Sequence, residues 1–242
     1  MSGILLIVSL IVLINYLENQ KKEKIKKEFK DYASSNNFKF IDTYRKFDFS
    51  TFINNLFNSN NNSNDNNSVP IIDLIDNNSM LSVGTIENVI IKKEEKYTVY
   101  WGDHTYFTSS GKSRKAHNCF FVAIECDDLQ IPSFFVRDEA AVFDYLGKLL
   151  GGQDINFKGD NNFSPRFVLQ GNSEGDIRRF FTTKIRNAFV TYASNCGFKI
   201  YGQQNSIIIH VEKKLSTINE RLDLERKARG IFNAMYSEQI RD

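Results

Sequence analysis

A nearly continuous apolar run opens the chain and restricts the folds available to it. The run extends from Ile4 to Leu17, and Ser9 and Asn15 are its polar interruptions. A helix that spans a bilayer needs about 20 apolar residues, with a lower limit near 17. Leu, Ile and Val each favour insertion by roughly 0.3 to 0.6 kcal/mol at the helix centre. We therefore predict a transmembrane helix over residues 1–17.

Two alternatives to a membrane anchor remain open. A cleaved signal peptide has basic residues before its apolar run and small residues after it, whereas here no Lys or Arg precedes Ile4 and the run ends in Asn15-Tyr16-Leu17. A buried core helix that is apolar on every face needs protein all round it. A single-pass anchor fits the pattern better than either alternative.

A cluster of lysines follows the apolar run and predicts the orientation of the chain. Basic residues beside a span favour the cytoplasmic side, so we expect a single-pass membrane protein with its C-terminal domain in the cytoplasm. Residues 18–36 form a predicted basic juxtamembrane helix, whose lysines are candidates for contact with anionic lipids of the bilayer. The alternative is a solvated helix face that only determines topology. These candidate membrane-surface residues are Lys21, Lys22, Lys24, Lys26, Lys27 and Lys30.

The overall composition argues against several other classes of protein. The chain has 31 Lys and Arg against 29 Asp and Glu, a formal charge of +2, so no global charge favours nucleic acid as a partner. Its three cysteines, Cys119, Cys126 and Cys196, are an odd number without a CxxC pair, which argues against a disulfide framework or a zinc site. They are consistent with a reducing compartment. The sequence predicts no cofactor.

The segment 37–83 is predicted to hold one short strand and a disordered loop. The juxtamembrane helix should end at Asn36-Asn37, because Asn tolerates the left-handed conformation that terminates helices. A strand at Phe38–Ile41 follows. Residues 54–68 are rich in Asn and Ser and too polar to bury a core, so we predict that they are disordered.

Residues 84–242 are predicted to form the soluble α+β domain. Segments rich in β-branched and aromatic residues predict strands near residues 85–92, 96–107, 118–125, 133–137, 166–170, 198–201 and 206–212. Helices are expected at residues 139–150, from a cap at Ser173 to Cys196, and after a Thr217–Glu220 capping box. This order predicts an antiparallel or mixed sheet packed by helices and preceded by the N-terminal transmembrane helix.

One internal similarity links the two ends of the chain. The segment Phe29–Ser34, followed by Phe38-Lys39, matches Phe189–Ser194, followed by Phe198-Lys199, without a gap. Each is predicted to be a helix end, a polar cap and a strand start. Both a common way of building such a junction and an ancient duplication account for the match.

Chemically reactive residues form few patterns. The sequence Ser110-Gly111-Lys112-Ser113 lacks the earlier glycine and the following helix of a phosphate-binding loop. Asp103, His104 and His117 flank the same predicted hairpin, so they are candidates for a metal-dependent hydrolase site. Two exposed strand histidines are the alternative. We predict no catalytic or metal-ligating residue from these patterns.

Three charged residues punctuate apolar runs in the second half of the chain. Arg137, Asp154 and Arg166 are candidates for a structural ion pair that holds the loop between a helix and a strand.

The chain from about Gly84 to its C-terminus resembles a family of bacterial proteins of uncharacterised function. The resemblance rests on Pro132-x-Phe134-x-x-Arg137, then Gly151-Gly152-x-Asp154-Ile155, then Phe163-Ser164-x-x-Phe167-x-Leu169-x-Gly171. It implies a single-pass, membrane-anchored protein with a soluble α+β domain. It implies no activity and no catalytic residue. Asp138-Glu139 departs from the Pro-Glu that follows the arginine in that family.

Together these patterns predict a cytoplasm-facing interaction or accessory domain at the membrane, with an unidentified protein partner. The first alternative is a membrane-tethered metal-dependent hydrolase that uses Asp103, His104 and His117. The second is a module that binds lipid or another small ligand through its many aromatic residues.

Overall fold

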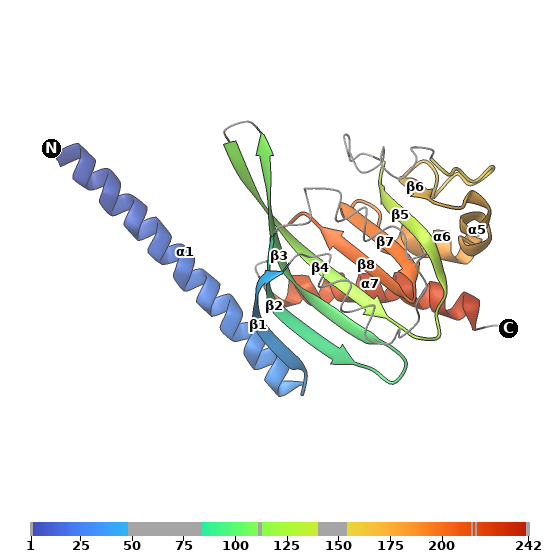
Figure 1. The fold of residues 1–242 in the computed structure, drawn as a ribbon, viewed down its shortest axis with the longest axis horizontal. Helices are drawn as coiled ribbons and strands as arrows, with labels where there is room; N and C mark the ends of the chain where they lie inside the picture. The colour runs from blue at the N-terminus through green and yellow to red at the C-terminus, as the bar shows by residue number, and fades with distance from the viewer. Residues whose placement is uncertain are drawn as a thin grey trace.

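A long N-terminal helix projects from a sheet that is covered by further helices (Figure 1). The computed structural model describes residues 2–47, 84–110, 113–139, 154–213, 215 and 217–240. The predicted disordered loop at 54–68 and nearly all of the predicted helix at 139–150 lie outside these residues. Helix α1 spans Ser2–Ser35 without a break. It ends as predicted, because Asn37 adopts a φ of 57° before the first strand.

The described strands form one eight-stranded antiparallel sheet in the order β1-β2-β3-β4-β8-β7-β5-β6. This confirms the predicted α+β class and resolves the sheet as antiparallel. The strands are β1 (Lys39–Phe47), β2 (Gly84–Lys93), β3 (Thr98–Ser110), β4 (Ser113–Glu125), β5 (Ile131–Asp138), β6 (Phe167–Gly171), β7 (Phe198–Gln204) and β8 (Ser206–Val211).

The helical pattern after β6 differs from the sequence prediction in one respect. The single helix expected after Ser173 is two helices, α5 (Glu174–Phe180) and α6 (Thr183–Tyr192). Ser173 caps α5 as expected, and the side chain of Thr182 accepts a hydrogen bond from the amide of Ile185 to begin α6. The prediction of one helix was wrong because the apolar stripe continues across the break.

The last helix, α7 (Ile218–Gln239), begins where the sequence predicts. Thr217 and Glu220 form a reciprocal capping box, in which the Thr217 side chain accepts from the Glu220 amide and the Glu220 side chain accepts from the Thr217 amide. The buried face of α7 includes Leu224, Ala228 and Ile231.

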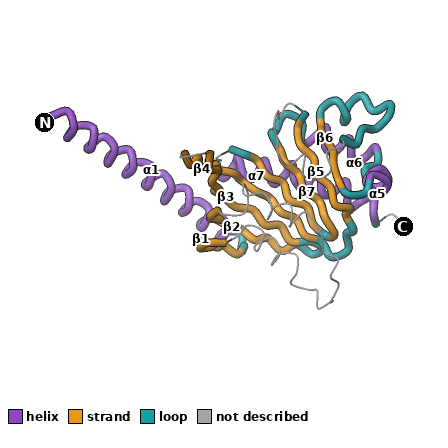
Figure 2. Tube along the Cα trace, turned by 45° about the horizontal axis from the view of Figure 1, so that its top comes forward, coloured by secondary structure: helices purple, strands orange, loops and turns teal. Residues whose placement is uncertain are grey.

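The helices cover one face of the sheet and bury the larger apolar core there (Figure 2). Alternate residues of each strand point to opposite faces, so Trp101 and Phe120 join this core while Tyr106 and Phe121 belong to a smaller cluster on the other face.

The matching segments at the two ends of the chain adopt similar structures. Phe29 and Phe189 are both fully buried, and each lies near the end of a helix that leads into a strand. Gly197 has a φ of 64°, which corresponds to the 57° of Asn37 in the first copy. The similarity in sequence is thus also a similarity in local structure.

Candidate functional site

Helix α1 divides into an exposed N-terminal part and a part that packs against the sheet. In its N-terminal turns, the described large apolar side chains from Ile7 to Leu17 are 47% to 62% exposed. Ile25, Phe29 and Ala33 are buried under the helical face of the sheet. Within the described part of the chain, no helix combines the length and the apolar character that a membrane span requires. The transmembrane helix at residues 1–17 therefore stays a prediction.

The predicted membrane-surface lysines lie at the junction of these two parts. Lys21, Lys22, Lys24, Lys27 and Lys30 are exposed. Lys26 differs from them, because its Nζ lies 2.6 Å from Oδ2 of Asp42 on β1. The hydrogen bond to Asp42 raises the pKa of Lys26. Lys26 thus contacts the sheet domain, and a role of the other five at a lipid surface stays a prediction.

A cavity of about 320 Å³ lies where α1 meets the sheet and the start of α7. It is lined by residues from α1, β1, β2, β3, β4 and α7, together with Leu215, which lies just before α7. Its polar and charged lining residues are Lys22, Glu23, Lys26, Asp42, Thr43, Glu87, Asn88, Asp103, Thr105, Asn118 and Arg221, and its other lining residues are Ile25, Cys119 and Leu215.

A buried ion pair forms part of the wall of this cavity. Nη2 of Arg221 lies 2.7 Å from Oδ1 and 2.9 Å from Oδ2 of Asp103. The side chain of Arg221 is 2% exposed and that of Asp103 is 22% exposed. Burial lowers the pKa of Arg221, and the charge of Asp103 partly opposes this shift. The pair therefore joins the first turn of α7 to the middle of β3.

Further contacts position both members of the pair. The guanidinium of Arg221 lies 4.0 Å above the ring of Phe29, and its Nη2 donates to the carbonyl of Leu215 at 3.0 Å. Asn88 sits in a β-bulge with a φ of 54°, and its Nδ2 donates to Oδ2 of Asp103 at 2.9 Å. The bulge thus turns an amide toward the cavity wall.

Some hydrogen-bonding capacity at the cavity remains unused. Nε and Nη1 of Arg221 are buried and have no hydrogen-bond partner among the residues that the structure describes. An unsatisfied buried donor costs about 1 to 3 kcal/mol. In the same cavity wall, Oγ1 of Thr105 donates a hydrogen bond to Oδ1 of Asn118 at 3.2 Å. Asn118 is exposed, and its amide nitrogen has no hydrogen-bond partner among the described residues.

The charges of the lining residues nearly balance. Three cations, Lys22, Lys26 and Arg221, lie among four carboxylates, those of Glu23, Asp42, Glu87 and Asp103. Two of the carboxylates are already paired with two of the cations. The cavity thus offers many donors and acceptors without a strong field of either sign.

The three residues proposed for a metal site are divided between two faces of the sheet. Asp103 faces α7, whereas His104 stacks on Tyr106 on the opposite face, with ring centroids 5.6 Å apart. The ring of His117 also stacks on the ring of Tyr106, with centroids 4.7 Å apart. Within the described ranges, no group of three or more His, Cys, Asp or Glu side chains could hold a metal ion. Asp103 does not join the two histidines, because consecutive strand residues point to opposite faces. The interpretation of two exposed strand histidines was wrong for His104, which is fully buried.

The three candidates for a structural ion pair are placed around β5 and β6. Oδ1 of Asp154 accepts from the amide of Leu169 at 3.0 Å, and its Oδ2 accepts from Asn156 at 3.2 Å. Arg137 donates to the carbonyl of Asp138, and the side chain of Arg166 is exposed. Asp154 holds the loop to β6 through backbone contacts, and an ion pair among the three stays a prediction.

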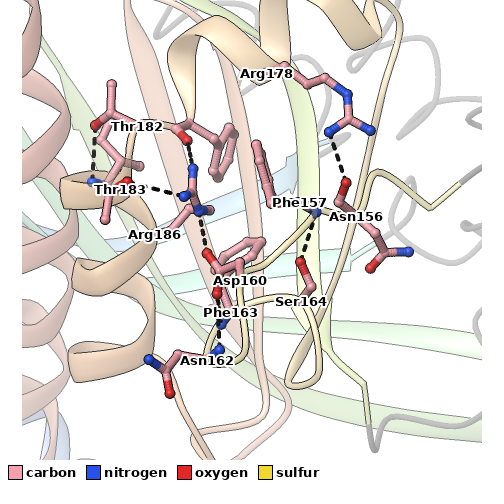
Figure 3. A network of polar contacts seen from close by, with 12 residues as sticks. Asn156, Phe157, Asp160, Asn162, Phe163, Ser164, Arg178, Thr182, Thr183 and Arg186 are labelled. Atoms are coloured by element: carbon pink, nitrogen blue, oxygen red, sulfur yellow. Dashed lines mark hydrogen bonds and ion pairs between the residues drawn. The ribbon is translucent and has the colours of Figure 1, made fainter.

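A different arginine holds this loop to the helices (Figure 3). Nε of Arg186 on α6 lies 2.5 Å from Oδ2 of Asp160, and its guanidinium covers the ring of Phe157 at 4.3 Å. The other oxygen of Asp160 accepts from the amides of Asn162 and Phe163 at 3.0 and 2.7 Å. Burial raises the pKa of Asp160, but these hydrogen bonds and Arg186 lower it by more. This network has a structural role.

Sequence reasoning missed Arg221 as the central residue of the cavity. A signal was present, since Arg221 occupies a position three residues before Leu224 and seven before Ala228, on the apolar stripe of α7. A charged residue on such a stripe indicates a buried partner. The identity of the partner was not visible, because Asp103 lies 118 residues away in the sequence.

Comparison with known proteins identifies a shared fold. No protein-family model matches the chain, and no curated protein sequence matches it. The crystal structure of the mycobacterial trehalose monomycolate transport factor A, TtfA, is similar, with a TM-score of 0.52 and 11% sequence identity. The similarity covers 87% of this chain and 94% of the TtfA chain. At this identity the comparison shows a common α+β fold.

Proposed function

We propose that the protein is an accessory or interaction module attached to a membrane by α1, with its α+β domain on the cytoplasmic side. The observation that carries this proposal is the exposure of the apolar N-terminal turns of α1. Ile7, Val12 and Leu13 are each more than half exposed, and at 100° per residue they lie on three different sides of the helix. A helix that is apolar all round needs an apolar environment all round, and a bilayer supplies one.

The packing of α1 against the domain supports the same function. Its C-terminal half is anchored by Phe29, whose ring meets Trp101 edge-on with centroids 5.9 Å apart. The exposed lysines follow directly after the apolar turns, so they lie at the height of the lipid headgroups and favour the cytoplasmic side for the domain. The helix thus holds the domain at a defined place beside the membrane.

The similarity to TtfA supports an accessory role more than an enzymatic one. The TtfA structure is described as a transport factor, so this fold serves a transport process in another protein. The alternative of a metal-dependent hydrolase loses its structural basis, since Asp103 faces away from His104 and His117. An accessory module acts through a protein partner, and we expect one in the same membrane.

Membrane attachment is tested by fractionating cells that express the full chain. We expect the wild-type chain to stay in the pellet after alkaline carbonate extraction. Leu10→Arg places a charge in the middle of the apolar turns, at a cost of about 2.5 to 3.5 kcal/mol for insertion, and should move the chain to the supernatant. Gln20→Arg adds the same charge on the same helix beyond these turns and should leave the chain in the pellet. Extraction of the wild-type chain by carbonate would contradict the proposal.

Orientation and partnership need separate measurements. Protease added to intact cells should leave the domain uncut if it faces the cytoplasm, and digestion from outside would overturn this assignment. Proximity labelling from a fusion at the C-terminus should identify a membrane protein whose labelling is lost in the Leu10→Arg variant. Equal labelling of the same protein by that variant would show that the membrane is not needed for the interaction.

A further inference from the structure

We propose that the cavity between α1, the sheet and α7 binds an uncharged, hydroxyl-rich group such as a sugar ring. This binding site goes beyond the proposed accessory function, and only a lipid headgroup as the source of the ligand rests on the proposed membrane attachment. It rests on the polar groups of the cavity wall, on their charge balance and on the volume of the cavity.

The donors and acceptors of the wall match the needs of hydroxyl groups. A hydroxyl both donates and accepts hydrogen bonds, so it is best met by a wall that offers both. Asp103 presents a carboxylate, Asn88 and Asn118 present amides, and Thr105 presents a hydroxyl. Arg221 also lines the cavity, but its unpartnered Nε and Nη1 are buried, so a ligand oxygen reaches them only if the side chain moves.

The charges of the wall argue against an ion as the ligand. A phosphate would meet four carboxylates, and a cation would meet Lys22, Lys26 and Arg221. Arg221 and Lys26 already have carboxylate partners, at 2.7 and 2.6 Å. A neutral ligand gains hydrogen bonds from these groups and avoids repulsion from either set.

The size and position of the cavity agree with a single polar ring or a short polyol. Its volume of about 320 Å³ lies at the lower end of the range of about 300 to 1,000 Å³ for ligand pockets. Lys22, which lines it, lies five residues beyond Leu17, or roughly 7.5 Å along the helix axis. Lipid headgroups occupy roughly 5 to 7 Å on each side of the hydrocarbon core. The same group could therefore come from a free sugar or from the headgroup of a glycolipid.

The experiment uses the full chain in phosphatidylcholine nanodiscs prepared without sugar-based detergent. In one arm, methyl β-glucoside is titrated in by calorimetry. In the other, nanodiscs that also contain glucosyl diacylglycerol are analysed by native mass spectrometry for retained lipid. Saturable binding in the first arm identifies a free sugar as sufficient, and retention in the second arm alone identifies the lipid headgroup. The absence of binding in both arms overturns the proposal.

Matched variants locate the site and its chemistry. Thr105→Val with Asn118→Leu removes one half-buried and one exposed polar side chain from the cavity wall and should weaken binding about tenfold. Thr191→Val with Asn233→Leu makes the same changes on α6 and α7 outside the cavity lining and should leave binding unchanged. Unaltered binding by the first double variant overturns the proposed site.

A test of charge separates a neutral ligand from an anion. Raising the salt from about 0.05 to about 0.5 M should leave binding within about twofold of its low-salt value, because screening acts on charged ligands. A steep fall of binding with salt overturns the proposal in favour of an anionic headgroup.

Discussion

Arg221 and Asp103 form an ion pair whose two members differ in their access to water. The arginine side chain is 2% exposed and the aspartate is 22% exposed, although Nη2 and Oδ1 lie only 2.7 Å apart. The carboxylate can therefore turn to water or to Asn88 if its partner is removed, whereas the guanidinium cannot reach solvent. Removing the charge of Asp103 and removing the charge of Arg221 should therefore lower the free energy of unfolding by different amounts.

We predict that Asp103→Asn destabilises the protein more than Arg221→Met. The first change leaves a buried guanidinium without a counter-charge and should cost about 3 kcal/mol, the lower limit for breaking a buried pair. The second replaces the cation with an apolar side chain of similar length and should cost less than about 2 kcal/mol. Urea denaturation of the full chain in detergent, monitored by circular dichroism, measures both. A larger loss in Arg221→Met would contradict the assigned asymmetry.

The stability of the fold should fall as the pH drops below neutrality, because His104 is buried. Burial lowers the pKa of His104 from 6.5 to about 4 in the folded state. Between these values the unfolded chain binds a proton that the folded chain does not. The contribution of His104 is therefore fully present above pH 6.5 and is lost as the pH falls to about 4, by up to about 1.4 kcal/mol per pH unit. Burial also lowers the pKa of His210.

A histidine variant isolates this contribution. His104→Phe should flatten the decline in unfolding free energy between pH 6.5 and 4, measured by urea denaturation at intervals of pH. An unchanged slope in His104→Phe would show that other groups cause the decline.

The features predicted well from the sequence depend on local patterns. The capping box of Thr217 and Glu220 and the helix end at Asn37 follow from residues within one turn, so the start of α7 and the end of α1 were predictable. The break between α5 and α6 was not, because the apolar stripe from Ile177 to Phe189 continues across it and only the side chain of Thr182 begins the second helix.

The cavity depends on long-range geometry and could not be predicted. Its wall combines Lys22 on α1, Asn88 in a bulge of β2 and Arg221 on α7, which are brought together by the order of the strands. The bulge interrupts a segment that reads as a regular strand in the sequence. Side chains alternate between the two faces of a strand, so Asp103 and His104 lie on opposite faces of the sheet. The strand assignment made from the sequence therefore already argued against a metal site that uses both residues.

Gly202 is predicted to be essential for packing between β7 and β5. A Cβ atom at this position would lie 2.1 Å from Cε1 of Phe134, whose ring is fully buried over the glycine. Gly202→Ala should therefore destabilise the fold by about 1 to 3 kcal/mol through overpacking. Gly175→Ala is the control, because it lies in α5 with nothing within 4 Å of the added atom. It should be neutral or stabilise the fold by up to about 1 kcal/mol. Equal thermal melting of the two variants would contradict this packing.

Phe29 is predicted to hold α1 to the domain. Its buried ring contacts Trp101 at 5.9 Å and lies 4.0 Å from the guanidinium of Arg221. Phe29→Ala should cost about 3 to 5 kcal/mol, as expected for removal of a buried aromatic side chain. Since Trp101 is the single tryptophan of the chain, its fluorescence reports this contact directly, and its emission should shift to longer wavelength as water reaches the ring. Tyr16→Ala removes an exposed aromatic residue from the same helix and should leave the emission unchanged. An unshifted spectrum in a folded Phe29→Ala variant would show that α1 is held by other contacts.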